Sequence, residues 1–166
     1  AAPARAGGIP PVMLRGKDAS AGAVRRAAAG QRVLHFATHG FFEPLHPGAD
    51  DPLDRAGVLL AAGDGDDGRL TAAELATWPL DGIDLVVLSA CDTAEGDRSY
   101  AEGLAGLPSA LATAGVRRSL LARWPVSDRG AARFMARFYD HLAAGESYEA
   151  AFRATKLDVL EGRLAG

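Results

Sequence analysis

Short apolar runs divide the chain and predict β-strands. The run at residues 85–90 has five apolar residues, Leu85 to Leu88 and Ala90, and is rich in Val and Leu, which is typical of a parallel strand covered on both faces. It stops abruptly at Cys91. Residues 9–14 contain Pro10 and Pro11, which cannot donate ladder hydrogen bonds, so they form a short edge strand at most. The predicted strands are residues 32–37, 57–62, 85–90 and 116–124.

Between these runs, apolar residues recur at helical spacing. Phe134, Phe138 and Leu142 lie at i, i+4 and i+8, and this pattern predicts one buried helix face. In the last helix we expect Ala150, Ala154, Leu157 and Leu160 to point inward. Pro108 should weaken or kink the helix that carries Leu107 and Leu111. The helices are predicted to begin at Asp18 or Ser20, at a Thr71–Glu74 capping box, near Leu104, at Ser127 or Asp128, and at Ser147.

The alternation of strands and helices predicts an α/β fold with a mainly parallel sheet and helices on both faces. A chain of 166 residues is long enough for one well-buried domain. We therefore expect residues 9–166 to form a single domain. Residues 1–8 resemble a linker, which suggests that the chain is part of a longer protein.

Composition narrows the classes of function. The chain is 48% hydrophobic and 23% charged, with a formal net charge of -3, as in ordinary globular proteins. The sequence shows no basic stripe, so we do not expect nucleic-acid binding. One cysteine excludes an internal disulfide and fits a reducing compartment. No apolar run of membrane-spanning length and no signal peptide is evident, so we expect a cytoplasmic protein without a membrane partner.

Two residues that follow predicted strands could carry chemistry. His39 follows the strand at residues 32–37 and Cys91 follows the strand at 85–90, and the two are 52 residues apart. In open α/β sheets, ligands bind at the carboxyl ends of the strands. A caspase-type enzyme places its His about 50 residues before such a Cys. The pair therefore predicts a Cys–His dyad.

Each residue has a plainer interpretation when taken alone. A lone cysteine is usually a small buried hydrophobe, and a His after a strand is usually structural; only the joint position and spacing favour the dyad. If His39 and Cys91 form a dyad, the backbone N–H groups of Gly40 and Cys91 would bind the oxyanion. Gly40 would also permit backbone angles that other residues resist. We expect His35 to be a core-facing or packing residue, and His46 and His141 to lie at the surface.

Three ordered motifs resemble the CHAT domain, a group of bacterial caspase-like cysteine peptidases related to separase and gingipain. The motifs run from Leu34 to Gly40, from Val86 to Thr93 and from Leu121 to Asp128. The resemblance covers nearly the whole chain. It implies a caspase-like three-layer α/β/α sandwich with a mainly parallel central sheet. It also implies His39 and Cys91 as the dyad, with no obligatory third residue, metal or cofactor.

The resemblance bears on specificity as well. In the separase branch, an acidic residue after the next strand lines the pocket for a basic side chain, and Asp128 stands at the matching place. A carboxylate can select Arg through bidentate hydrogen bonds, and Asp92 could add negative potential. Asp128 could equally be a helix N-cap. Ala94 and Pro108 depart from the usual family pattern.

Other site chemistries fit less well. A phosphatase loop is rejected because Arg98 follows Cys91 after six residues rather than five and acidic neighbours would repel phosphate. A calcium loop starting at Asp64 would have Gly68 at its fifth position and Leu75 at its twelfth, so this segment is predicted to be a solvated turn.

The sequence thus predicts an endopeptidase that cleaves a protein substrate after Arg or Lys. The alternative is a catalytically silent caspase-like module that serves as an interaction or scaffold domain. A regulatory or repeat region is expected before Ala1, because such domains are often held inactive by other segments.

Overall fold

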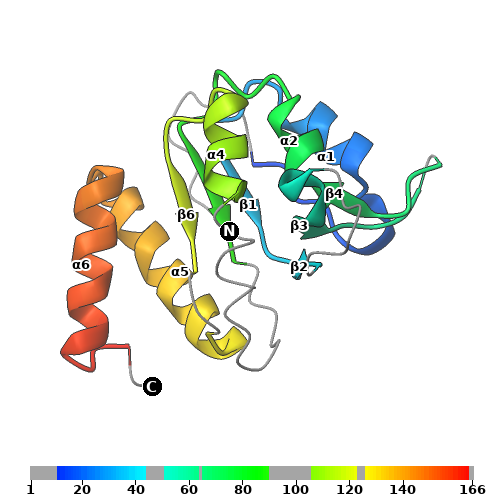
Figure 1. Ribbon diagram of the computed structural model, residues 1–166. Helices are drawn as coiled ribbons and strands as arrows, with labels where there is room; N and C mark the ends of the chain where they lie inside the picture. The colour runs from blue at the N-terminus through cyan, green and yellow to red at the C-terminus, as the bar shows by residue number, and fades with distance from the viewer. Residues whose placement is uncertain (1–10, 44–50, 64, 90–105, 123–125, 165–166) are drawn as a thin grey trace. The chain divides into compact units, whose positions relative to one another are not determined.

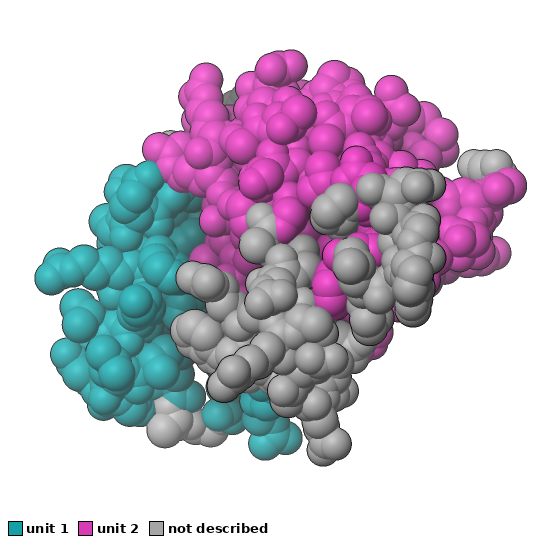
Figure 2. Space-filling model, in the orientation of Figure 1, with its two compact units in different colours: residues 1–11, 126–166 teal, residues 12–125 magenta. Residues whose placement is uncertain are grey.

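The computed structural model describes residues 11–43, 51–63, 65–89, 106–122 and 126–164 (Figure 1). The chain forms two compact units, which Figure 2 colours separately. One comprises residues 12–125, and the other comprises residues 1–11 and 126–166. Within the described ranges, no helix combines the length and the apolar character needed to cross a membrane.

A parallel sheet forms the centre of the larger unit. It has the order β1-β5-β6, with β1 at Val33–Phe36, β5 at Leu85–Leu88 and β6 at Ser119–Leu121. Both pairings are parallel. Every residue of β5 is buried, although successive side chains point to opposite faces. The prediction of a central strand covered on both faces is therefore confirmed.

A second, antiparallel sheet has the order β2-β3-β4. It consists of β2 at Gly40–Phe42, β3 at Ala56–Leu59 and β4 at Arg69–Thr71. The sequence pattern predicted β3 but missed β2 and β4, because a strand of three residues is too short to show alternation. Gly57 is required in β3: a Cβ atom there would lie 2.1 Å from the Leu70 carbonyl oxygen.

The first two α-helices of the larger unit begin where the sequence predicts. Ser20, rather than Asp18, caps α1 (Ala21–Ala28) by accepting the Ala23 N–H. The predicted capping box opens α2 (Ala72–Ala76). Pro108 lies within α4 (Gly106–Thr113). Short 3₁₀ turns occupy Gly16–Asp18 and Pro52–Arg55.

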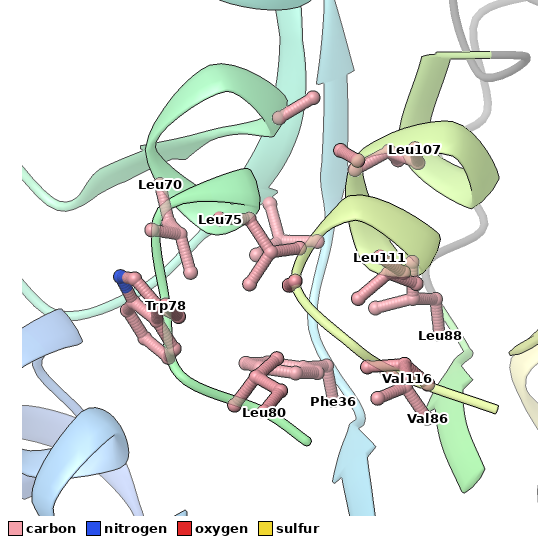
Figure 3. Close-up of a cluster of buried hydrophobic side chains, with 14 of the residues drawn as sticks. Phe36, Leu70, Leu75, Trp78, Leu80, Val86, Leu88, Leu107, Leu111 and Val116 are labelled. Carbon is pink, nitrogen blue, oxygen red and sulfur yellow. The ribbon is translucent and has the colours of Figure 1, made fainter. Parts of the chain in front are cut away.

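One hydrophobic cluster joins these helices to both sheets. Leu75 of α2 and Leu111 of α4 meet Phe36, Val86 and Leu88 of the parallel strands (Figure 3). The cluster also takes in Val58 of β3 and Leu70 of β4. Because the same core supports both sheets, the carboxyl ends of β1 and β5 rest on rigidly packed elements.

The smaller unit contains α5 (Asp128–Ala143) and α6 (Tyr148–Leu160). Phe134 of α5 packs edge-on against Phe152 of α6, with ring centroids 5.9 Å apart. Phe138 is buried, as its spacing predicts. Ser147 caps α6, also as predicted, by accepting the Ala150 N–H.

The buried face of α6 differs from the prediction. Ala151, Thr155 and Asp158 are buried, whereas Leu157 and Leu160 are exposed, Leu160 by 79%. The face is rotated because Asp158 accepts hydrogen bonds from Arg137 at 2.5 Å and Arg163 at 2.6 Å. These bonds lower the pKa of the Asp158 carboxyl well below its usual range, so it stays charged although it is only 3% exposed.

His141 of α5 is half-buried and belongs to the same network. Its Nδ1 lies 2.7 Å from Glu146 Oε1 and its Nε2 lies 3.1 Å from Asp158 Oδ2. Hydrogen bonding to Glu146, and then to Asp158, raises the pKa of His141 above its ordinary value. This histidine therefore joins α5 to α6.

Candidate active site

The register of the parallel sheet relates the two dyad candidates. Each residue of β1 pairs with the β5 residue 52 positions later, ending with Phe36 and Leu88. His39 and Cys91 are also 52 positions apart, and each stands three residues beyond the last pair of its strand. Because neighbouring parallel strands end at the same sheet edge, the chain leaves β1 and β5 at adjacent points of that edge.

His39 is attached to the antiparallel sheet through its backbone. Its carbonyl oxygen accepts the Leu59 N–H at 2.8 Å, and the neighbouring Thr38 Oγ1 donates to the Leu59 carbonyl oxygen at 2.5 Å. The residue itself is exposed, and its imidazole makes no hydrogen bond or ion pair with residues that the structure describes. The backbone is thus fixed while the side chain remains accessible.

The N–H of Gly40 points away from β3. Leu59 donates to His39, and Glu43 donates to Arg55, so these residues occupy hydrogen-bonded positions of the β2–β3 ladder. Antiparallel pairs alternate, which makes Gly40 and Val58 a non-hydrogen-bonded pair. Gly40 is not among the glycines with positive φ. What distinguishes Gly40 is the direction of its N–H.

A hydrogen bond links the ends of β1 and β5. His35 Nε2 lies 2.5 Å from Ser89 Oγ. The expected core-facing position of His35 is wrong, because the residue is exposed and the adjacent Phe36 takes the core position. Partial desolvation nevertheless lowers the pKa of His35, which favours the neutral ring at neutral pH. Ser89 was not anticipated, since its partner is 54 residues away.

The remaining predicted site residues fall in two places. Cys91 and Asp92 lie outside the described residues, as do Ala94 and His46. Asp128 is exposed and is the first residue of α5, in the smaller unit. Ser127 is the N-cap and accepts the Gly130 N–H at 3.2 Å. The alternative interpretation of Asp128 as the N-cap is therefore wrong.

A family model for the CHAT domain matches residues 2–165. The chain belongs to the CHAT domain family. The match spans both compact units and confirms the family to which the three sequence motifs pointed. CHAT domains are caspase-like and related to cysteine peptidases, and the mixed α/β architecture with a parallel sheet is compatible with that fold. No curated protein matches this chain.

The acidic turn of this CHAT domain uses its carboxylates internally. Asp66 Oδ1 accepts the Gly68 N–H at 2.7 Å, and Asp67 Oδ1 accepts the Arg69 N–H at 2.9 Å. Across the part of the chain that the structure describes, no group of three or more His, Cys, Asp or Glu residues is arranged to hold a metal ion. The described carboxylates of the turn serve to close it.

The chemistry available at the carboxyl edge of the CHAT-domain sheet is that of an imidazole. His39 is exposed on a fixed backbone, and an accessible imidazole can act as a general base. A thiol at the matching position after β5 would be a suitable partner, because a thiolate is a strong nucleophile.

Proposed function

We propose that this CHAT domain is a cysteine endopeptidase that uses Cys91 as nucleophile and His39 as general base. The observation that carries the proposal is the parallel register: the pairing offset of β1 and β5 equals the separation of the two residues. The exposed imidazole of His39 supports it, because a base must reach both thiol and substrate.

The reaction would proceed through a thioester. His39 takes the proton of the Cys91 thiol, and the sulfur attacks the scissile carbonyl carbon. The tetrahedral intermediate collapses, its C–N bond breaks, and the leaving amine takes the proton from His39. Water, deprotonated by His39, then attacks the thioester, which releases the carboxyl product and returns the proton to the thiol.

The backbone N–H groups of Gly40 and Cys91 would stabilise the oxyanion. The ladder alternation that directs the Gly40 N–H away from β3 supports this role. A backbone N–H that donates to β3 would have to break that hydrogen bond before it could bind the oxyanion. The Gly40 N–H points away from β3 and needs no such rearrangement. Such preorganised donors account for much of the catalysis in acyl transfer.

A basic residue is proposed before the scissile bond. Asp128 would receive an Arg or Lys side chain of the substrate, with Asp92 adding negative potential. Asp128 is exposed and is not consumed in capping α5, which supports a role in binding. An Arg guanidinium can bind a carboxylate through two parallel hydrogen bonds, so Arg should be preferred over Lys.

The proposed setting is cytoplasmic, with a protein substrate and with a regulatory or repeat region in a longer protein. The one cysteine in the sequence fits a reducing compartment. The alternative function is that of a silent interaction module. It predicts binding of a protein partner without reaction at Cys91.

Labelling of the cysteine tests the proposal. Peptidyl acyloxymethyl ketones that carry Arg or Asp would be compared on the wild-type domain, Cys91→Ala and His39→Ala, with the modified residue located by mass spectrometry. We expect the Arg reagent to label Cys91 rapidly. Cys91→Ala should abolish the reaction, and His39→Ala should reduce its rate by about 10³-fold, with little change in thermal unfolding.

The same assay separates the two functions. If the wild-type domain and the full-length protein both react no faster than a free thiol, the endopeptidase proposal is wrong. Labelling of only the full-length protein would show that another segment activates the dyad. Equal rates for the Arg and Asp reagents would leave the dyad intact and contradict the basic preference.

A further inference from the structure

We propose that His35 and Ser89 form a positioning pair that fixes the end of β5 immediately before the nucleophile. This inference rests on the proposed function and names residues beyond the dyad. Neither side chain is assigned to the chemical step. Their role would be to hold the chain from which Cys91 follows, two residues after Ser89.

Ser89 is held to β1 by two separate hydrogen bonds. Its N–H donates to the Phe36 carbonyl oxygen at 3.0 Å, which extends the parallel ladder one residue beyond β5. Its Oγ lies 2.5 Å from His35 Nε2. His35 pairs with Val87 in the register, so Ser89 is the next β5 residue on the same face. Backbone and side chain thus fix the last described residue before Cys91.

The position of the pair explains why the chemistry would need it. Val87 and Leu88 are fixed by ladder bonds and by the core, whereas Ser89 follows the last residue of β5 and is only half-buried. A displacement of about 1 Å at a reacting group can cost about a hundredfold in rate. A rigid Ser89 restricts where a nucleophile two residues later can lie.

The ring of His35 suits this role because its environment favours the neutral form. Partial desolvation lowers the pKa of His35, which disfavours a positive charge at the edge of the sheet where His39 is proposed to act. A neutral imidazole can bind the serine hydroxyl as a donor or as an acceptor. The hydrogen bond therefore persists in either tautomer.

The pair contributes little to the hydrophobic core. His35 is exposed and Ser89 is half-buried, while the buried side chains of these strand ends are Phe36, Val87 and Leu88. Replacement of a partly exposed hydrogen bond usually costs about 1 kcal/mol or less. Loss of this hydrogen bond should therefore lower the reaction rate much more than the stability of the fold. This difference separates a positioning role from a structural one.

The test compares Ser89→Ala, His35→Gln and the double variant with the wild-type domain. The inactivation rate constant kinact and the affinity constant KI for the Arg acyloxymethyl ketone would be measured with the unfolding temperature. We expect kinact to fall about 10- to 100-fold while KI and the unfolding temperature change little. The double variant should be no slower than the slower single variant, because Ser89→Ala and His35→Gln both remove the hydrogen bond between these two side chains.

Two controls define the outcome. Ser109→Ala makes the same change at an exposed position of α4 and should leave kinact unchanged, whereas Ser89→Thr keeps the hydroxyl and should restore most of the rate. Wild-type kinetics in both Ser89→Ala and His35→Gln, with labelling still dependent on His39, would overturn this inference alone. A wild-type domain that reacts no faster than a free thiol would overturn the proposed function and this inference together.

Discussion

The two ends of the parallel sheet are held by different kinds of interaction. At the amino end, Asp84 is only 5% exposed and accepts hydrogen bonds from Arg32 Nε at 2.6 Å and Arg117 Nη1 at 3.2 Å. At the carboxyl end, hydrogen bonds join His35 to Ser89 and Thr38 to the Leu59 carbonyl oxygen. His39 is exposed there. The amino end uses charge to align strands, whereas the carboxyl end keeps an imidazole accessible.

The arrangement at the amino end is structural because it joins three successive strand beginnings. Arg32 precedes β1, Asp84 precedes β5 and Arg117 lies two residues before β6. Backbone bonds follow the same path, since Asp84 donates to the Arg32 carbonyl oxygen at 2.8 Å. A carboxylate that is fully used in such contacts has little capacity to bind a substrate.

Among single substitutions, we expect the largest effect on the labelling rate at Asp128, which follows β6 along the chain. Asp128→Ala should lower the labelling rate with the Arg ketone about a hundredfold, because a substrate guanidinium would lose its charged partner. The Asp ketone should be affected much less. Asp140→Ala, an exposed carboxylate of the same helix, is the matched control and should change neither rate. An unchanged Arg rate in Asp128→Ala would contradict the proposed role of Asp128 in substrate binding.

The next effect concerns stability at the amino end. Asp84→Asn should lower the free energy of unfolding by about 1–3 kcal/mol, because two guanidinium groups lose a charged acceptor. The loss is moderate because both arginines are largely solvent-exposed. Denaturant unfolding measures the change. The labelling rate per folded molecule should stay at the wild-type value; a selective loss of labelling would contradict the division between the two ends.

A smaller effect is expected where Thr38 fixes the backbone of His39. Thr38→Val removes the hydroxyl that donates to Leu59 and keeps the shape of the side chain. We expect kinact for the Arg ketone to fall about tenfold, because the imidazole would be held less firmly. Thr38→Ser restores the donor and should recover most of the rate. Equal rates in all three proteins would show that the Leu59 backbone bond alone suffices.

The smallest effect is a pH dependence of stability that depends on His141, away from the candidate site. The pKa of His141 is raised in the folded state, so its contribution is full below its ordinary pKa of 6.5 and is lost as pH rises through the raised value. The pKa of Asp158 is lowered, so its contribution is full above 3.8 and is lost as pH falls below that value.

Stability measured by thermal unfolding should therefore decline in the wild-type domain as pH rises above 6.5. The groups involved are His141 and Arg137 on α5, Glu146 before α6, Asp158 on α6 and Arg163 after it. His141→Gln should be less stable at pH 5.5 and should lose the decline above pH 6.5. An identical pH profile in the variant would contradict the role of His141 in this network.

The parallel sheet was predictable because its signal is local. A continuous apolar run marks β5, and the offset between His39 and Cys91 matches the β1–β5 register. The small antiparallel sheet was not predictable, since β2 and β4 have three residues each and their pairing depends on β3.

Polar contacts between distant residues were also beyond the sequence pattern. The apolar spacing of α6 pointed to Leu157 and Leu160, but the partners of Asp158 on α5 and after α6 decide which face is buried. Likewise, His35 and Ser89 are 54 residues apart. Once the register is known, however, both fall on one face, so a register hypothesis could have suggested the pair.

The central claim is that the carboxyl ends of β1 and β5 bring positions 39 and 91 together. Because Cys91 is the one cysteine in the sequence, His39→Cys creates a defined thiol pair, and Gln31→Cys places the second thiol before β1 at the other end of the sheet. At low protein concentration, dibromobimane should crosslink the His39→Cys protein within one chain and become fluorescent, but should not crosslink the Gln31→Cys protein. Equal crosslinking of both, or of neither, would contradict the account.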